Sequence, residues 1–125
     1  MLFDTDILIW VQRGNHLAAT LVEKEEKRCI SVLTYMELLQ GAREKRQHEY
    51  IMDFLHEFNF QILPLSENIG HRAAIYIEEY SLPHGLRAGD ALIAATATEN
   101  GVTLCTTNVK HYRPIKELKL KIFKP

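Results

Sequence analysis

Short apolar or β-branched runs recur along this chain and alternate with segments of helical periodicity. The runs lie at residues 1–4, 28–32, 60–63 and 102–106. Strands that are separated by helices usually pair in parallel, because each helix carries the chain back across one face of the sheet. The alternation therefore predicts an α/β sandwich, in which helices cover a mainly parallel sheet.

Apolar side chains also indicate where the helices lie. They recur every three or four residues over 51–58, and again over 69–80 behind Ser66, a predicted N-cap. Small and apolar residues surround the segment 88–98 on almost every side, which predicts a buried central helix. Residues 118–122 alternate leucine or isoleucine with lysine, a pattern typical of a half-exposed edge strand.

Length and composition favour one soluble domain. The chain has 125 residues, 46% of them hydrophobic and 25% charged, which suits a single core spanning residues 1–125. No uncharged stretch is long enough to cross a bilayer, and Asp4 and Asp6 interrupt the apolar start of the chain, so we expect a cytoplasmic protein. Cys29 and Cys105 each lie in an apolar run, where we expect buried reduced thiols, with a disulfide left open.

The charge balance gives no overall attraction to nucleic acid, since the formal net charge is −1. Contact with RNA would have to come from local basic patches. One candidate is the segment 110–125, with six basic residues against Glu117 alone, and the other is the group 43–46, expected to close a helix that begins near Thr34. Either patch is equally well explained as solvated surface.

Asp4 is the first candidate site residue. It ends the first apolar run and precedes a helix expected over residues 5–12, so its carboxylate should project beyond the carboxyl edge of the sheet. Open α/β sheets bind their ligands at that edge. The alternative is a structural N-cap that accepts hydrogen bonds from the first N–H groups of the helix.

Glu37 lies in a predicted helix whose buried stripe is expected to contain Leu33, Met36 and Leu39. It stands one turn from Leu33, at the margin of that stripe. A carboxylate there is partly desolvated, and a bound cation would keep it ionised. The alternative is an ordinary exposed helix residue.

Asp90 is the most informative acidic residue. Its own helical face continues through Ile93, Ala94 and Ala97, all of them apolar. A buried carboxylate is costly unless it is paired, protonated or bound to a metal. The alternative is an aspartate in the first turn of a helix, stabilised by the free N–H groups there.

Three carboxylates at element starts or core margins together indicate a hard divalent cation, and oxygen ligands suit Mg²⁺ or Mn²⁺. Nothing in the sequence has the spacing of a zinc site, and the six histidines are scattered without an obvious partner. Glycine-rich nucleotide motifs and a serine-hydrolase elbow are absent from the sequence.

Four segments, in this order, resemble PIN-domain ribonucleases of the VapC toxin type. They are MLFDTDILIW, the glutamate in SVLTYMELLQGA, GDALIAATA and TLCTTNVKHY, and they span nearly the whole chain. The resemblance implies a three-layer α/β/α fold with an acidic pocket at the carboxyl edge of the sheet. It also implies a Mg²⁺-dependent endoribonuclease toxin, with Mn²⁺ able to substitute, that acts on tRNA or ribosomal RNA. A cognate antitoxin of the VapB type would neutralise it by occupying the groove near that pocket, and a homodimer or a hetero-oligomer with the antitoxin is expected.

By resemblance, Asp4 and Asp90 are the principal metal ligands, Glu37 completes the acidic cluster, and Asp6 is an accessory carboxylate. Many relatives place a further carboxylate in the fourth motif, where this chain has Asn108 and no acid. Asn108 can still offer a carbonyl oxygen or hold a water. We therefore expect weaker metal binding, with one or two metal ions left open.

Two other functions fit parts of the sequence. A non-catalytic PIN-like scaffold that binds RNA or a partner would suit the missing fourth carboxylate. A receiver domain shares the length and the early acidic pair, but it needs a phosphoacceptor aspartate after the third strand. The only spare aspartate, Asp53, lies inside a predicted helix. The RNA that is cut, the bond and the antitoxin are not specified by the sequence.

Overall fold

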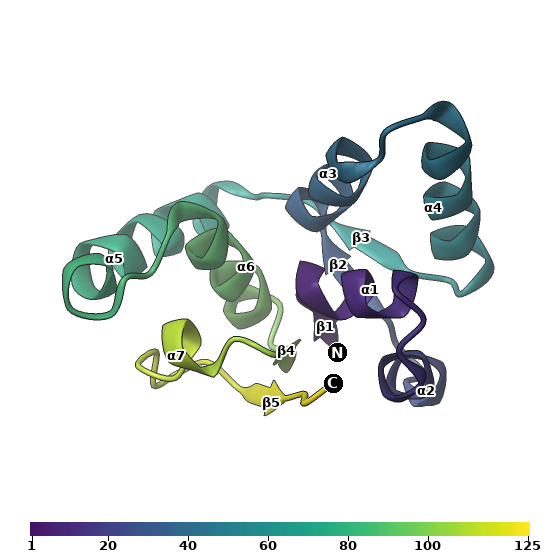
Figure 1. The fold of residues 1–125 in the computed structure, drawn as a ribbon. Coiled ribbons are helices and arrows are strands. Elements are labelled where there is room, and N and C mark those ends of the chain that lie inside the picture. Colours follow the sequence, from purple (N-terminus) through teal and green to yellow (C-terminus); the bar gives the residue numbers. More distant parts are fainter.

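The computed structural model describes all residues, 1–125, and contains one parallel sheet of five strands in the order β3-β2-β1-β4-β5 (Figure 1). The strands are β1 (Leu2–Phe3), β2 (Cys29–Ser31), β3 (Gln61–Leu63), β4 (Leu104–Thr106) and β5 (Leu120–Ile122). Every neighbouring pair is parallel. The predicted α/β class and the parallel sheet are confirmed.

Seven helices connect and cover these strands. They are α1 (Thr5–Gln12), α2 (His16–Lys24), α3 (Val32–Gly41), α4 (Lys45–Glu57), α5 (Glu67–His84), α6 (Ala88–Glu99) and α7 (Val109–Tyr112). The predicted helices correspond to α1, α3, α4, α5 and α6, and the hydroxyl of Ser66 caps α5 by accepting from the Ile69 N–H at 3.2 Å. Neither α2 nor α7 was expected. None of the helices is long and apolar enough to pass through a membrane.

Side chains alternate between the two faces of the sheet and build a separate core on each. Leu2 and Leu104 point into the core formed with α5, α6 and α7, whereas Phe3, Ile30 and Cys105 point into the core formed with α1 to α4. Figure 1 shows these two sets of helices on opposite sides of the strands. This is the three-layer α/β/α arrangement that the resemblance implied.

Helix α6 has the central position that its sequence predicted. Ala91, Ala94, Ala95 and Ala97 are fully buried, and the small side chains let α6 approach both the sheet and α5 closely. This packing fixes the start of α6, and with it Asp90, against the carboxyl edge of the sheet.

Two predictions about α3 are wrong. The helix ends at Gly41, so Lys45 and Arg46 begin α4 instead of closing α3. Its buried residues are Thr34 and Leu38, while Met36 is 49% exposed. At the far end of the chain, β5 is an edge strand as expected, with Lys121 exposed.

Candidate functional site

Polar side chains gather at the carboxyl edge of the two central strands. Asp4 follows β1 directly, and Thr106 ends β4, the strand that pairs with β1. Parallel pairing brings the carboxyl ends of both strands to one edge, which is where open α/β sheets bind ligands. Asp90 at the start of α6 and Glu37 on α3 reach the same region through the hydrogen bonds described below.

Asp4 caps α1 and also contacts the end of β4. It is only 7% exposed, and its Oδ1 accepts a hydrogen bond from the Thr5 N–H at 2.8 Å, which caps α1. Its Oδ2 accepts from the hydroxyl of Thr106 at 2.8 Å, in the buried space between β1 and β4. The alternative role of Asp4 as an N-cap is therefore correct for Oδ1, while Oδ2 contacts the end of β4.

Burial makes the charge on Asp4 costly. Desolvation, and after it the nearby Asp6 carboxylate, raise the pKa of Asp4 from 3.8 to about 7. The hydroxyl of Thr106 acts in the opposite direction, because hydrogen bonds to the ionised form lower the pKa. A carboxylate in this state gains from a neighbouring cation, which compensates its lost hydration.

Asp6 turns from the first turn of α1 towards the end of β4. Its Oδ2 accepts from the Thr107 N–H at 3.0 Å, from the Thr107 hydroxyl, and at 3.4 Å from the Thr106 hydroxyl. Its Oδ1 is shielded from solvent and has no hydrogen-bond partner in the protein. A buried carboxylate oxygen without a donor is rare, and it marks a place where a cation or a water would be stabilised.

Glu37 is an exposed residue that nevertheless contacts the site. Its Oε1 accepts from the Thr5 hydroxyl at 2.7 Å, and that hydroxyl also lies 2.9 Å from the hydroxyl of Thr34. The expected partial burial at the margin of an apolar stripe is wrong, since Glu37 is exposed. Its link to Asp4 is indirect and runs through Thr5, so a place for Glu37 beside a shared cation stays a prediction.

Asp90 lies in the first turn of α6, with 24% of its side chain exposed. The expected apolar face behind it is confirmed, because Ile93, Ala94 and Ala97 are all buried. The carboxylate itself is not deeply buried. Its Oδ2 lies 3.1 Å from Nδ1 of His111, and its Oδ1 accepts from the Tyr112 hydroxyl at 3.4 Å.

The hydroxyl of Tyr112 lies near both Asp90 and Asp4. The ring is fully buried, and burial together with the charges of Asp4 and Asp90 raises the pKa of its hydroxyl, so it stays a hydrogen-bond donor. The same hydroxyl lowers the pKa of Asp4, because a donor near that carboxylate favours its ionised form. A neutral donor between two carboxylates reduces their mutual repulsion and holds their oxygens in fixed orientations.

Asn108 caps α7. Its Oδ1 accepts from the His111 N–H at 3.4 Å, its Nδ2 lies 3.0 Å from His111 Nδ1, and its own N–H donates to the Thr106 hydroxyl at 3.0 Å. The fourth motif thus contacts the site through Asn108, which bonds Thr106 and His111, and through His111, which lies next to Asp90. That Asn108 holds a metal or its water stays a prediction.

The acidic cluster is defined as Asp4, Asp6, Glu37 and Asp90, and neighbouring threonine and tyrosine residues link its members. The Thr106 hydroxyl contacts Asp4 and Asp6, and Thr5 contacts Asp4 through its N–H and Glu37 through its hydroxyl. The Tyr112 hydroxyl donates to Asp90 and lowers the pKa of Asp4. No three His, Cys, Asp or Glu side chains are arranged closely enough to hold one metal ion directly. The four carboxylates share one region and do not form a closed ligand cage.

Sequence reasoning missed the residues that link these carboxylates. They are Thr5, Thr106, His111 and Tyr112, whereas Thr107 was expected beside Asn108 in the fourth motif. Two threonines directly after an apolar strand were a usable signal, because a strand end at a ligand-binding edge is a common place for hydroxyl donors. The contact of His111 with Asp90 had no such signal, and the expectation that no histidine has a partner is wrong for it.

Comparison with known proteins now adds to this geometry. The family model for the PIN domain matches residues 1–116. The chain belongs to the PIN domain family. A relative named Ribonuclease VapC10, from Mycobacterium tuberculosis, is 34% identical to this PIN domain over 123 residues, which are 95% of the chain and 90% of the relative. Ribonuclease VapC1 from Methanocaldococcus jannaschii is 29% identical over 124 residues, or 98% of the chain and 86% of the relative.

Solved structures support the same family. A toxin–antitoxin complex from Klebsiella pneumoniae contains a chain that is 32% identical to this PIN domain, with a TM-score of 0.80 and coverage of 94% and 93% of the two chains. VapBC2 from Rickettsia felis, bound to a DNA fragment from its promoter, also gives a TM-score of 0.80, covering 98% of each chain at 23% identity, and bears on the fold alone.

Membership of the PIN domain family removes the receiver interpretation. The structure agrees, because the aspartate that a receiver would phosphorylate, Asp53, is exposed on α4 and follows no strand.

Proposed function

We propose that this PIN domain is a metal-dependent endoribonuclease and the toxin of a toxin–antitoxin pair. The observation that carries the proposal is the buried carboxylate of Asp4, which shares the carboxyl edge of the sheet with Asp6 and Asp90. Relatives named as VapC ribonucleases match the chain nearly from end to end. Carboxylates brought together at such cost are typical of a site that holds a divalent cation, and such a cation can neutralise charge on a phosphodiester.

Magnesium fits these residues better than a metal that needs a full protein cage. Mg²⁺ usually keeps several waters and binds proteins through one or two carboxylates. Asp4 and Asp90 are the direct ligands in this proposal, and Asp6 and Glu37 act through waters, in keeping with the absence of a direct set of three. The unpartnered Oδ1 of Asp6 suits a water or a cation. Mn²⁺ has similar ligand preferences and can take the same place.

The bound cation would supply a more acidic water and neutralise charge on the phosphoryl group. The protein does the positioning. Thr106 and Tyr112 donate to the aspartates and keep their remaining oxygens directed towards the site. Asp4 stays ionised when a cation offsets its burial. Because water attacks in this scheme, the RNA 2′-hydroxyl takes no part, and the products carry 5′-phosphate and 3′-hydroxyl ends.

The substrate and partners follow the family resemblance. We infer that the RNA is a transfer or ribosomal RNA, and that a small antitoxin protein binds this domain and blocks the acidic cluster. One of the similar solved structures is a toxin–antitoxin complex. A homodimer, or an assembly with the antitoxin, belongs to the same proposal.

The decisive experiment incubates the purified protein with labelled RNA in Mg²⁺ or in EDTA. We expect cleavage only with Mg²⁺, and loss of cleavage in Asp4→Asn and Asp90→Asn, two substitutions that retain side-chain size. Asp53→Asn, an exposed change on α4, is the matched control and should cut like the wild type. Digests with 2′,3′-cyclic phosphate ends would exclude the scheme.

A non-catalytic scaffold remains the second candidate, because Asn108 stands where many relatives have a carboxylate. The same experiment separates the two. A protein that binds RNA with unchanged affinity in Mg²⁺ and EDTA, and never shortens it, would be a scaffold.

A further inference from the structure

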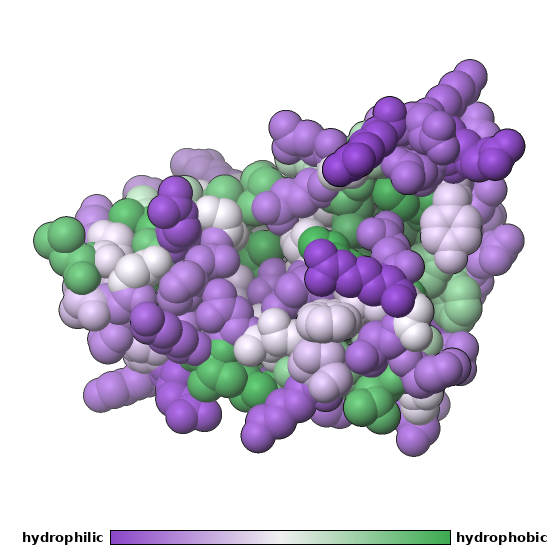
Figure 2. Space-filling model, in the orientation of Figure 1, coloured by the Kyte–Doolittle hydropathy of each residue, from purple (hydrophilic) through white to green (hydrophobic).

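A groove lined with basic and aromatic residues lies beside the acidic cluster, on the other side of α7. It is an open groove of about 620 Å³, bounded by the end of α5 and the segment 109–116. Its lining residues are Tyr80, His84, Val109, Lys110, Arg113, Pro114 and Lys116. Figure 2 shows that the surface over α7 is mostly hydrophilic. The proposed catalytic chemistry makes no use of this groove.

Three basic side chains line the groove, and the acidic residues Glu79 and Glu117 line the neighbouring hollow that shares Tyr80 and Lys116 with it. Lys110, Arg113 and Lys116 are all exposed, and none of them forms an ion pair in the structure. No acidic residue lines the groove. The nearby Glu117 is occupied elsewhere, since it accepts from Arg72 at 2.7 Å and from the Tyr76 hydroxyl at 2.5 Å. Three free cations in a chain of net charge −1 form a local site for a polyanion.

Two aromatic rings form one wall of this groove. Tyr80 and His84 lie one turn apart on α5, with ring centroids 6.2 Å apart and planes inclined by 48°. Flat rings beside cations are the combination that single-stranded nucleic acids use, because bases stack on the rings while phosphates contact the cations. An acidic peptide would use the cations but has no need of the rings.

Helix α7 separates the groove from the acidic cluster. Within α7, Asn108, His111 and Tyr112 face the carboxylates, whereas Val109, Lys110 and Arg113 face the groove. A helix is about 10 Å across, and a strand with stacked bases advances about 3.4 Å along its axis for each phosphate. A strand with a phosphate at Asp90 would therefore cover the groove within about three nucleotides.

The end of α5 lies close to His111, the residue that contacts Asp90. Gly85, which follows His84, closes α5 with a φ of +70°, and a Cβ built on it would lie 3.9 Å from His111 Nε2. The aromatic wall is thus attached to the residue that contacts Asp90.

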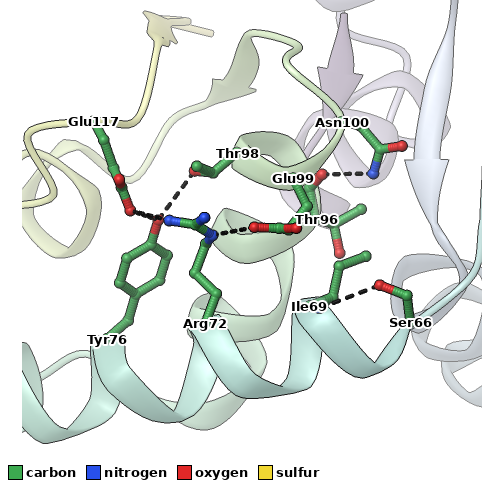
Figure 3. A network of polar contacts seen from close by, with 9 residues as sticks. All are labelled: Ser66, Ile69, Arg72, Tyr76, Thr96, Thr98, Glu99, Asn100 and Glu117. Carbon is green, nitrogen blue, oxygen red and sulfur yellow. Dashed lines mark hydrogen bonds and ion pairs between the residues drawn. The ribbon is translucent and has the colours of Figure 1, made fainter.

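A polar network fixes the opposite wall. Arg72 on α5 donates to Glu99 on α6 at 2.5 Å and also holds Glu117, the neighbour of Lys116 (Figure 3). Tyr76 donates to Glu117 from the same side of α5. These contacts keep the segment 113–117 against α5, so the groove is formed before a ligand binds, which reduces the entropic cost of binding.

We propose that this groove binds the single-stranded RNA that flanks the scissile phosphate, with bases on Tyr80 and His84 and phosphates on Lys110, Arg113 and Lys116. The proposal rests on the ribonuclease function above and assigns to it a path for the substrate. In this arrangement, substitutions in the groove should weaken RNA binding without changing the carboxylates that carry out the reaction.

The test measures binding of a fluorescein-labelled, 12-nucleotide single-stranded RNA of mixed sequence to the Asp90→Asn protein in EDTA, at several KCl concentrations. Lys110→Ala/Lys116→Ala is compared with Lys24→Ala/Lys27→Ala, a pair of equally exposed lysines on and after α2. Each phosphate contact contributes about 0.7 to the slope of log Kd against log salt for a single strand. The groove pair should lower that slope by about 1.4, and the control pair should leave it unchanged.

A second comparison tests the rings. Tyr80→Leu should weaken RNA binding several-fold, and Tyr50→Leu, at a 64% exposed position on α4, should not. Equal affinities and slopes for the groove and control pairs would overturn the groove proposal, even if the wild type cuts RNA. A glutamate-rich peptide that loses binding in the groove pair, with RNA binding unaffected by Tyr80→Leu, would assign the groove to a protein partner and overturn it too. Failure of the wild type to cut RNA in Mg²⁺ is a different result, which contradicts the ribonuclease itself.

Discussion

At the scale of single residues, the site depends on hydroxyl groups as much as on carboxylates. Thr106 is fully buried, donates to Asp4, and accepts from the Asn108 N–H. One side chain thus connects the first motif of the chain with the last. Such a network gives fixed orientations only when each member has its partner, so its residues act as a unit.

Asp4 gives the metal-free protein a distinctive dependence on pH. Its pKa of about 7 in the folded state exceeds the value of 3.8 that it has without burial, so ionisation disfavours the folded state. The stabilisation is complete below pH 4 and is lost as the pH rises to about 7, at a rate of up to about 1.4 kcal/mol per pH unit. Urea unfolding in EDTA should show this fall.

The control for this experiment is a pair of matched substitutions. Asp4→Asn can still cap α1 but cannot ionise, so its stability should vary less between pH 4 and 7 than that of the wild type. Asp53→Asn, on the exposed face of α4, should keep the wild-type profile. If the difference in stability between the wild type and Asp4→Asn stayed constant from pH 4 to 7, the pKa of Asp4 would not be raised by burial.

The residues predicted from the sequence were those whose local context is unusual. Asp4 follows a strand, and Asp90 precedes an apolar helical face, and both features are visible in a short window. His111 and Tyr112 could not be found in this way, because their contacts with Asp90 join α7 to α6 across about 20 residues and depend on the tertiary fold. The exposure of Glu37 also depends on how α3 is rotated, which periodicity fixes only to about one residue.

At the scale of elements, the sequence pattern predicted the strands and the amphipathic helices. It did not predict the short segments or those with an ambiguous pattern. A four-residue helix such as α7 has too few positions for a period to appear. The boundary between α3 and α4 was misplaced because basic residues are favoured at a helix end, whereas Lys45 and Arg46 lie at a beginning, where the helix dipole disfavours them. Long helices with clear apolar faces, such as α5, were predicted correctly.

Tyr76 provides a test of how α5 is joined to α6 and to the segment after α7. Its hydroxyl donates to Glu117 and lies 3.1 Å from the Thr98 hydroxyl, while its ring is buried in the core (Figure 3). Tyr76→Phe should therefore lower the free energy of unfolding by about 1 to 2 kcal/mol, since one hydrogen bond goes to a charged acceptor. Tyr50→Phe, at an exposed position, should have no effect, and equal stability of both variants would mean that the network contributes nothing.

At the scale of the whole molecule, the two cores share the sheet and also helix α3, which packs Leu33 against one core and Leu38 into the other. Strands β1, β2 and β4 send alternate side chains into each core, so neither set of helices has a complete apolar surface of its own to pack against. Disrupting one core removes support from the strands that organise the other. This mutual dependence predicts that residues 1–125 unfold as one cooperative unit.

Leu104 and Trp10 allow that prediction to be tested across the sheet. Leu104 is fully buried in the core with α5 and α6, whereas Trp10, the single tryptophan, lies on α1 and covers the opposite face. Leu104→Ala should cost about 2 to 5 kcal/mol, and it should shift the urea transition seen by Trp10 fluorescence as far as the one seen by circular dichroism. If the tryptophan transition stayed in place while the dichroism changed in two steps, the two layers of helices would be separate folding units. Coincident shifts would mean that packing lost around Leu104 destabilises α1 as much as α6. The acidic cluster lies at the ends of the strands between these helices, so it would unfold only together with the whole domain.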